Sequence, residues 1–302
     1  MTVGRALITG AGGFVGSALA GGFLRLGWQV CALDTTFDVP ARARLSEAEL
    51  VCADLGGPLP ELSRADVIIH AAALTTGPEA LGITPAEHLR RNMLPLLAAL
   101  GLAEAMAPRA FVFLSSTGVF AAGDGDADLT DRSEPSGSGP YAAAKRAGEI
   151  VVPAVLGAAT APHVLRLGHI CGLAEASRPT RARVSPMAEM VAAARAGEAV
   201  PLASTDPLRD WTAAEDLAPA MVRLLAAPPA GRVLHFGSPH RMTDSAMAAR
   251  IAARIPGLRI ETRPAATPKA PMRPSTVAAL EGFSWTRPEE VIDALCAARL
   301  AA

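Results

Sequence analysis

A tyrosine and a lysine four residues apart, Tyr141 and Lys145, have the types and spacing that could do chemistry. Tyr141 is the only tyrosine among 302 residues, and on a helix its phenol and the Lys145 ammonium would share a face. Pro140 suits the first helical turn, and Ser138 is an acceptable cap before it. The ammonium favours the phenolate, so a phenol with an ordinary pKa of about 10 could accept a proton near neutral pH. The alternative is an ordinary helix start with a buried ring, and the preceding residues bear on that choice.

A glycine-rich turn lies near the start of the chain. Residues 3–9 are typical of a short buried strand, and residues 17–26 of a helix that ends at Gly27. Between them stand Gly10, Gly13 and Gly16. Glycines there let backbone N–H groups approach a pyrophosphate at the helix N-terminus, where the helix dipole also favours an anion. The alternative is simply a tight strand–helix turn.

An acidic residue, Asp34, follows the next expected strand, residues 29–33. At that distance past the glycines, a carboxylate can accept hydrogen bonds from the ribose hydroxyls of an adenine dinucleotide. The same charge repels a 2′-phosphate, which favours NAD over NADP. The alternative is a strand-end aspartate that caps a turn.

Three further expected strands end in side chains or small residues that suit a ligand site. They are residues 49–52 before Asp54 and Leu55, residues 66–70 before Ala71, Ala72 and Ala73, and residues 110–114 before Ser115 and Ser116. The helix expected over 84–107 carries Asn92, which makes either a structural hydrogen bond or a water-linked relay. His70 is expected to be a packed strand-end histidine.

The alternation of strands and helices predicts an α/β fold with a doubly wound, Rossmann-type parallel sheet. The carboxyl ends of its strands meet at one edge, where such sheets bind ligands. We expect residues 1–168 to form the dinucleotide-binding domain. Residues 169–302 are expected to form a smaller C-terminal α/β lobe, interleaved with the first, and the substrate lies between the two.

Composition narrows the class of protein. The net charge of -1 and the pI near 6.6 argue against nucleic acid or an acidic membrane surface as a partner. The four cysteines are scattered, which is typical of a reducing compartment. The six histidines have no metal-binding spacing. We find no basic leader followed by a cleavage site, and expect a soluble, cytoplasmic protein.

Taken in order, these motifs resemble the extended short-chain dehydrogenase/reductase superfamily, specifically its NAD-dependent sugar epimerase/dehydratase family. The matching segments are residues 10–16 (GAGGFVG), Asp34, Asp54-Leu55, residues 70–73 (HAAA), Asn92, residues 115–120 (SSTGVF), residues 141–145 (YAAAK), residues 166–172 (RLGHICG) and residues 209–218 (RDWTAAEDLA). The resemblance covers nearly the whole chain.

The resemblance implies a role for each matched residue. Tyr141 would be the general acid/base, Lys145 would lower its pKa and hold the nicotinamide ribose, and Ser116 would bind the reacting oxygen. The implied contacts to NAD come from Gly10, Gly13, Phe14, Val15, Gly16, Asp34, Asp54, Leu55, Ala71, Ala72, Ala73, Asn92, Ser115, Tyr141 and Lys145. The implied contacts to substrate come from Thr75, Ser116, Thr117, His169, Arg178 and Arg209. No metal is implied, and a homodimer through helices 84–107 and 141–155 is expected by analogy.

Two departures from the family pattern bear on the reaction and the substrate. Ser116-Thr117-Gly118 lacks both carboxylates of the 4,6-dehydratase branch, which argues against the elimination of water. His169 replaces the asparagine that contacts the diphosphate of nucleotide sugars, whereas Arg209, beside the same diphosphate, is retained. A free sugar or sugar acid is therefore as plausible a substrate as a nucleotide sugar.

Residues 173–186 form a polar loop with Arg178, Arg181 and Arg183. Three arginines could clamp a carboxylate or phosphate; a solvated basic loop is the alternative. Taken together, the motifs predict an NAD-dependent oxidoreductase or epimerase that transfers hydride at a hydroxyl-bearing carbon of a carbohydrate-like substrate. A catalytically silent NAD-binding regulator of the same fold is the alternative.

Overall fold

The computed structural model describes residues 3–125, 127–157, 159–264 and 267–298. Its centre is a seven-stranded sheet in the order β10-β6-β5-β4-β1-β2-β3, in which all paired neighbours run parallel. The order steps outward from β1 in both directions, so the sheet is doubly wound, as predicted. The strands are β1 (Val3–Thr9), β2 (Trp28–Asp34), β3 (Glu49–Cys52), β4 (Val67–His70), β5 (Ala110–Ser116), β6 (Ala161–Leu167) and β10 (Leu234–His235).

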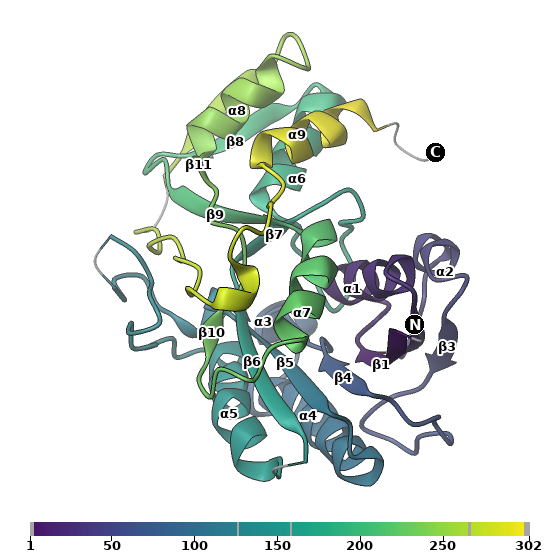
Figure 1. Ribbon diagram of the computed structural model, residues 1–302. Helices are drawn as coiled ribbons and strands as arrows, with labels where there is room; N and C mark the ends of the chain where they lie inside the picture. Colours follow the sequence, from purple (N-terminus) through teal and green to yellow (C-terminus); the bar gives the residue numbers. More distant parts are fainter. Residues whose placement is uncertain (1–2, 126, 158, 265–266, 299–302) are drawn as a thin grey trace.

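Helices cover both faces of this sheet (Figure 1). On one face lie α1 (Phe14–Arg25), α2 (Val39–Arg44) and α7 (Leu217–Leu225), and on the other lie α4 (Pro85–Met106) and α5 (Pro140–Val155). Ala6 and Ile8 of β1 join the core under α1, whereas Leu7 joins the core under α4. Because both faces are covered, the central strands β4 and β5 are buried and mostly apolar along their length instead of alternating with polar residues.

A smaller lobe stands above the carboxyl ends of the large sheet (Figure 1). Its core gathers Met187, Trp211, Met247 and Ile292. It holds a three-stranded sheet in the order β11-β9-β7 and a parallel pair of β12 with β8. Its elements are β7 (His169–Cys171), α6 (Pro186–Ala196), β8 (Ala199–Ala203), β9 (Leu208–Ala213), β11 (Arg241–Thr243), α8 (Asp244–Ala252), β12 (Arg259–Arg263) and α9 (Pro288–Ala297).

Two elements from the C-terminal half are built into the N-terminal layers. Strand β10 pairs with β6, and helix α7 packs against α1. The two helices approach so closely that a Cβ on Gly22 would lie 2.4 Å from the Ala218 Cβ. The halves are therefore interleaved, and the division at residue 168 stays a prediction.

The ends of several helices follow the local sequence. Thr84 accepts a hydrogen bond from the Glu87 N–H at the start of α4, and Gly197 ends α6 with a φ of 69°. The expectation for α5 is corrected in one detail, because its cap is Gly139 and not Ser138, and no side chain caps it. The remaining short elements are α3 (Pro78–Leu81) and the 3₁₀ turns η1 (Thr117–Val119), η2 (Ala214–Asp216) and η3 (Ala278–Leu280).

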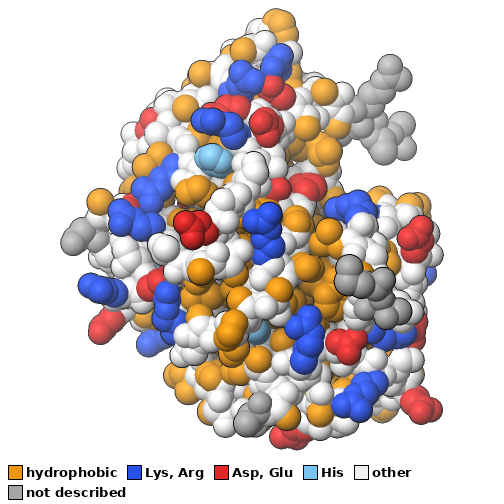
Figure 2. Space-filling model, viewed as in Figure 1, with side chains coloured by type: hydrophobic (Ala, Val, Ile, Leu, Met, Phe, Trp, Pro, Cys, Tyr) orange, Lys and Arg blue, Asp and Glu red, His pale blue; other side chains and the backbone are white. Residues whose placement is uncertain are grey.

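The surface carries both signs of charge. Figure 2 shows Lys and Arg side chains interspersed with Asp and Glu over both lobes of the visible face. Within the described ranges, no helix combines the length and the apolar character needed to cross a membrane.

Candidate active site

A cavity of about 540 Å³ lies where the large sheet meets the smaller lobe. Its floor is the carboxyl ends of β4, β5 and β6, and its opposite wall comes from β7 and residues 181–186. The cavity brings together nine of the residues predicted from sequence: Val15, Ala71, Ala73, Thr75, Ser115, Ser116, Tyr141, Lys145 and His169.

Tyr141 and Ser116 face the same cavity from α5 and from the end of β5. Gly118 lies between them: a Cβ there would lie 2.8 Å from the Tyr141 ring and 3.2 Å from the Ser116 Oγ. The Ser116 hydroxyl accepts a hydrogen bond from the Gly118 N–H at 2.9 Å, which fixes its direction. Burial raises the pKa of Tyr141, and the Ser116 hydroxyl and the charge of Arg181 oppose that rise.

Lys145 is buried one turn along α5 from Tyr141, on the same face. Its Nζ donates to the Leu114 carbonyl at 2.7 Å and lies 5.8 Å from the centre of the Tyr141 ring. Burial lowers the pKa of Lys145 to about 8, although the nearby Glu149 opposes this. The charge of Arg181 favours the Tyr141 phenolate. The expected lowering of the Tyr141 pKa by Lys145 stays a prediction.

Glu149, on α5, links this helix to β5 and β6. Its carboxylate accepts from the Ser115 hydroxyl at 2.6 Å and from the Arg166 guanidinium at 2.7 Å through two nitrogens. Both members of the Arg166–Glu149 pair are buried. Removing either partner of such a buried pair would leave an uncompensated charge and destabilise the protein.

The glycine-rich turn is packed as tightly as a dinucleotide-binding turn requires. Gly10 has a φ of +73°, and a Cβ on it would lie 2.5 Å from the Ala72 backbone. A Cβ on Gly16 would lie 2.0 Å from the Gly10 carbonyl oxygen. Gly13 caps α1 without a side chain, and the first turn of α1 has no acidic residue. The N-terminus of α1, which includes Phe14, is therefore suited to an anion.

Asp34 lies beside this turn, at the end of β2. Its carboxylate accepts from the Gly12 N–H at 2.8 Å and the Thr35 N–H at 2.7 Å, and the residue stays partly exposed. Asp54 accepts from the Gly56 N–H at 2.8 Å, and Leu55 is buried. Asp34 therefore lies next to the glycine-rich turn, as expected. Its contact to a ribose and the adenine contacts of Asp54 and Leu55 stay predictions.

Asn92 makes the structural hydrogen bond that was one of its two alternatives. Its Oδ1 accepts from the Leu74 N–H at 2.9 Å, and its Nδ2 donates to the Leu74 and His88 carbonyls. It does not line the cavity. Its hydrogen bonds instead hold the segment after β4, which does line the cavity. His70 is a packed histidine, as expected: it is buried against Phe113, and burial lowers its pKa to about 3.

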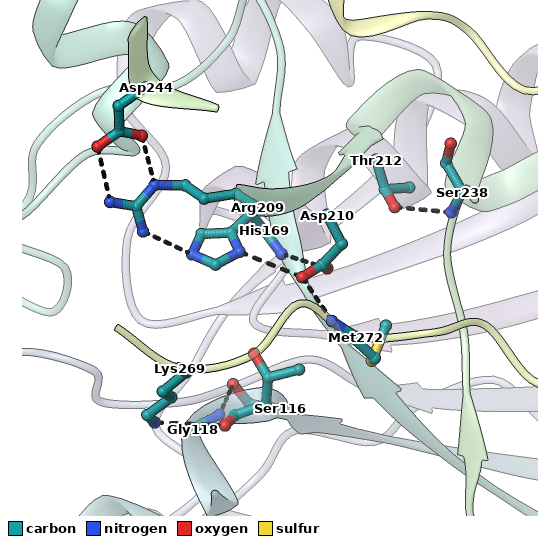
Figure 3. Close-up of polar contacts among 11 residues, drawn as sticks. Ser116, Gly118, His169, Arg209, Asp210, Thr212, Ser238, Asp244, Lys269 and Met272 are labelled. Atoms are coloured by element: carbon teal, nitrogen blue, oxygen red, sulfur yellow. Dashed lines mark hydrogen bonds and ion pairs between the residues drawn. The ribbon is translucent and has the colours of Figure 1, made fainter. Parts of the chain in front are cut away.

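His169 lies in the opposite wall, between an arginine and a carboxylate (Figure 3). Its Nδ1 is 3.5 Å from Asp210, and its Nε2 is 3.4 Å from a guanidinium nitrogen of Arg209. Arg209 is also held by two hydrogen bonds to Asp244, at 2.7 and 3.1 Å. Burial alone would raise the pKa of Asp210, but His169 and the Met272 N–H hold it below its ordinary value.

Of the remaining predicted substrate residues, Thr75 lines the cavity, whereas Thr117, Arg178 and Arg209 do not. The Thr75 hydroxyl donates to the Thr180 carbonyl at 3.1 Å. The Thr117 carbonyl is 3.5 Å from the Lys269 Nζ. Arg178 contacts the glycine-rich turn at the Gly12 carbonyl, so it lies on the cofactor side.

Sequence reasoning did not assign Glu149 to the site, and it named Arg181 only as one of three arginines that could clamp an anion. Glu149 had a signal, because it lies four residues after Lys145 and eight after Tyr141 on one helix face. Arg181 lines the cavity, while its guanidinium is 5.1 Å from the Phe14 ring centre. Arg183 lines the cavity as well, so two of the three arginines that the sequence proposed as an anion clamp face it.

Comparisons with known proteins agree with this geometry. The family model described as the NAD dependent epimerase/dehydratase family matches residues 6–237. No curated protein sequence matches significantly. Three solved structures of similar fold are an NAD-dependent NDP-hexosamine 5,6-dehydratase, TunA (22% identical, TM-score 0.80, 97% of each chain), a UDP-glucose 4-epimerase from Stenotrophomonas maltophila with bound NAD (20%, 0.78, 97% of this chain and 96% of that chain), and a UDP-N-acetylglucosamine 4-epimerase from Methanobrevibacter ruminantium M1 (17%, 0.83, 98% of each chain).

Proposed function

This chain belongs to the NAD-dependent epimerase/dehydratase family, and we propose that it transfers hydride at a hydroxyl-bearing carbon of a sugar, sugar acid or nucleotide sugar. Its cofactor is NAD, which when bound supplies the hydride acceptor and donor. The observation that carries the proposal is the convergence of Tyr141, Ser116 and Lys145 on one cavity at the carboxyl edge of the sheet.

The cofactor site fits a dinucleotide. The close packing of Gly10 and Gly16 leaves no room for side chains, and no side chain caps α1. Asp34 presents a carboxylate next to the same turn. A carboxylate there accepts from ribose hydroxyls and repels a 2′-phosphate, which supports NAD as the cofactor over NADP.

Tyr141 handles the proton in this proposal. As hydride leaves the substrate carbon, the phenolate of Tyr141 takes the hydroxyl proton, and the phenol returns it in the reverse direction. Ser116, oriented by the Gly118 N–H, holds the reacting oxygen. The Arg181 charge and the Ser116 hydroxyl favour the phenolate against the cost of burial, and the buried Lys145 is available to the nicotinamide ribose.

The contacts around His169 bear on whether the substrate carries a diphosphate. Arg209 already uses Nε and Nη2 on Asp244, and its Nη1 lies beside His169. These pairs leave fewer N–H groups for a diphosphate, which favours a free sugar or sugar acid over a nucleotide sugar. Ser116-Thr117-Gly118 supplies neither of the two carboxylates of the 4,6-dehydratase branch, so we propose epimerase or dehydrogenase chemistry and not dehydration.

A substrate panel tests the function. Sugars, sugar acids and nucleotide sugars are each incubated with enzyme and NAD, while NADH is followed by absorbance and products by chromatography. Accumulating NADH identifies a dehydrogenase, and an isomerised product without NADH identifies an epimerase. NAD binding with no turnover across all three classes would contradict the proposal and favour a silent regulator.

We also propose a homodimer through α4 and α5. Leu97 is 50% exposed and Ile150 is 70% exposed on these helices, and a shared apolar face of this kind suits an isologous contact. Sedimentation should show a dimer that Ile150→Asp weakens. A monomeric wild-type protein would contradict the assembly but leave the reaction untouched.

A further inference from the structure

Residues 175–185, here called the strap, reach from the smaller lobe to the glycine-rich turn. At its near end, Arg178 donates from Nη1 to the Gly12 carbonyl, 166 residues away in sequence. The Arg178 Nη2 lies 2.5 Å from the Asp38 carboxylate, at the start of α2. A guanidinium from the C-terminal half is therefore placed beside the N-terminus of α1, where the fold prepares an anion site.

Hydrogen bonds hold the strap along its length. Thr76 donates its hydroxyl to the Pro179 carbonyl and accepts from the Ala182 N–H, each at 2.8 Å. At its base, the Glu175 side chain is almost fully buried, and it accepts from the Ser185 N–H at 2.7 Å and from the Ser185 hydroxyl at 2.6 Å. Because backbone and side chains are both held, the position of Arg178 is set by the fold.

Arg178 pairs with Asp38, and this ion pair is expected to be weak. The Asp38 side chain is 42% exposed, and exposed ion pairs contribute about 0–1 kcal/mol because solvent screens them. An arginine fork binds phosphate oxygens through parallel charge-assisted hydrogen bonds, which are stronger. A doubly charged pyrophosphate at the α1 N-terminus is therefore the better acceptor for the same guanidinium.

We propose that Arg178 is a cofactor-binding residue: it exchanges Asp38 for the pyrophosphate of NAD, and the strap thereby retains the bound dinucleotide. This assignment replaces the substrate contact that the sequence predicted for Arg178. It rests on NAD as the cofactor and not on the reaction or the substrate.

The test compares two variants that remove opposite ends of one ion pair. Arg178→Gln should weaken NAD binding about 10- to 100-fold, mostly through faster dissociation. Asp38→Asn keeps an effective helix cap for α2 but releases Arg178, so NAD should bind equally or more tightly. Titration calorimetry gives the affinities, and the fluorescence of NADH in stopped flow gives the dissociation rates.

Three controls separate a direct contact from a structural tie. Arg178→Lys should recover part of the affinity, because one charge remains. Arg132→Gln, which removes an exposed arginine elsewhere, should leave NAD affinity unchanged. Binding of adenosine, which has no phosphate, should be the same in Arg178→Gln and wild type.

Two results would overturn the assignment. One is NAD affinity in Arg178→Gln equal to wild type. The other is equal weakening by Arg178→Gln and Asp38→Asn, which would mean that the pair only shapes the strap. Because no substrate is present in these titrations, failure here is distinct from failure of the proposed hydride transfer.

Discussion

The wall of the cavity formed by β5 and α5 differs from the wall formed by β7 and the strap in what holds its side chains. Tyr141, Lys145 and Glu149 are spaced along one helix and packed against one strand, with Lys145 and the Arg166–Glu149 pair buried. His169 and Arg178 are held by side-chain contacts to Asp210 and Asp38, which lie 41 and 140 positions away in the sequence. The first wall is suited to fixed proton chemistry. The second has exposed or partly exposed pairs that a ligand can rearrange.

The largest effect on NAD affinity should come from adding a side chain to the glycine-rich turn. Gly16→Ala puts a Cβ 2.0 Å from the Gly10 carbonyl oxygen, so the turn must open. We expect NAD affinity to fall by more than about 100-fold, since the α1 amides lose their alignment. Titration calorimetry measures it.

A matched control exists on α4. Gly101 is an exposed helical glycine whose added Cβ would meet nothing within 4 Å. Gly101→Ala should therefore leave NAD affinity unchanged and raise thermal stability slightly, as is usual for alanine in a helix. Equal NAD affinity in Gly16→Ala and wild type would show that the turn does not bind the dinucleotide.

Burial of Lys145 predicts a pH-dependent stability difference of intermediate size. Its pKa of about 8 lies below the ordinary 10.5, so between these pH values the unfolded chain holds a proton that the folded protein has released. Unfolding then becomes harder as the pH rises. Relative to Lys145→Met, the wild-type protein should gain about 2 kcal/mol from pH 8 to 10.5.

Denaturant unfolding of both proteins across that pH range measures this gain, and the variant cancels the contributions of other groups. A difference that stays constant with pH would mean that Lys145 is not buried as a cation.

The smallest effect should come from the second wall. His169→Asn removes the imidazole contacts to Asp210 and Arg209. A single hydrogen bond is worth about 1 kcal/mol, so KM for the substrate should change by roughly 3- to 10-fold. Steady-state kinetics give KM, and calorimetry should find NAD affinity unchanged. A kcat loss as large as that of a Tyr141 variant would place His169 in the chemistry itself.

The contrast between the two walls also explains which features could be predicted from the sequence. The strands, the glycine-rich turn, Asp34 and the Tyr141–Lys145 pair follow short periodic patterns, so the doubly wound sheet and its carboxyl edge were predicted correctly. Arg178 was placed with the substrate because its contact to Gly12 spans 166 residues. Likewise, the pairing of β10 with β6 and the role of Arg181 depend on how distant segments pack, which no local spacing encodes.

Single-turnover hydride transfer in Tyr141→Phe tests the central claim most directly, once the panel has supplied a substrate. The phenyl ring keeps the packing but cannot exchange a proton. The rate should fall by about 10²–10⁴-fold while NAD affinity stays within about twofold of wild type. Hydride transfer at the wild-type rate would contradict the assignment of Tyr141 as the group that handles the substrate proton.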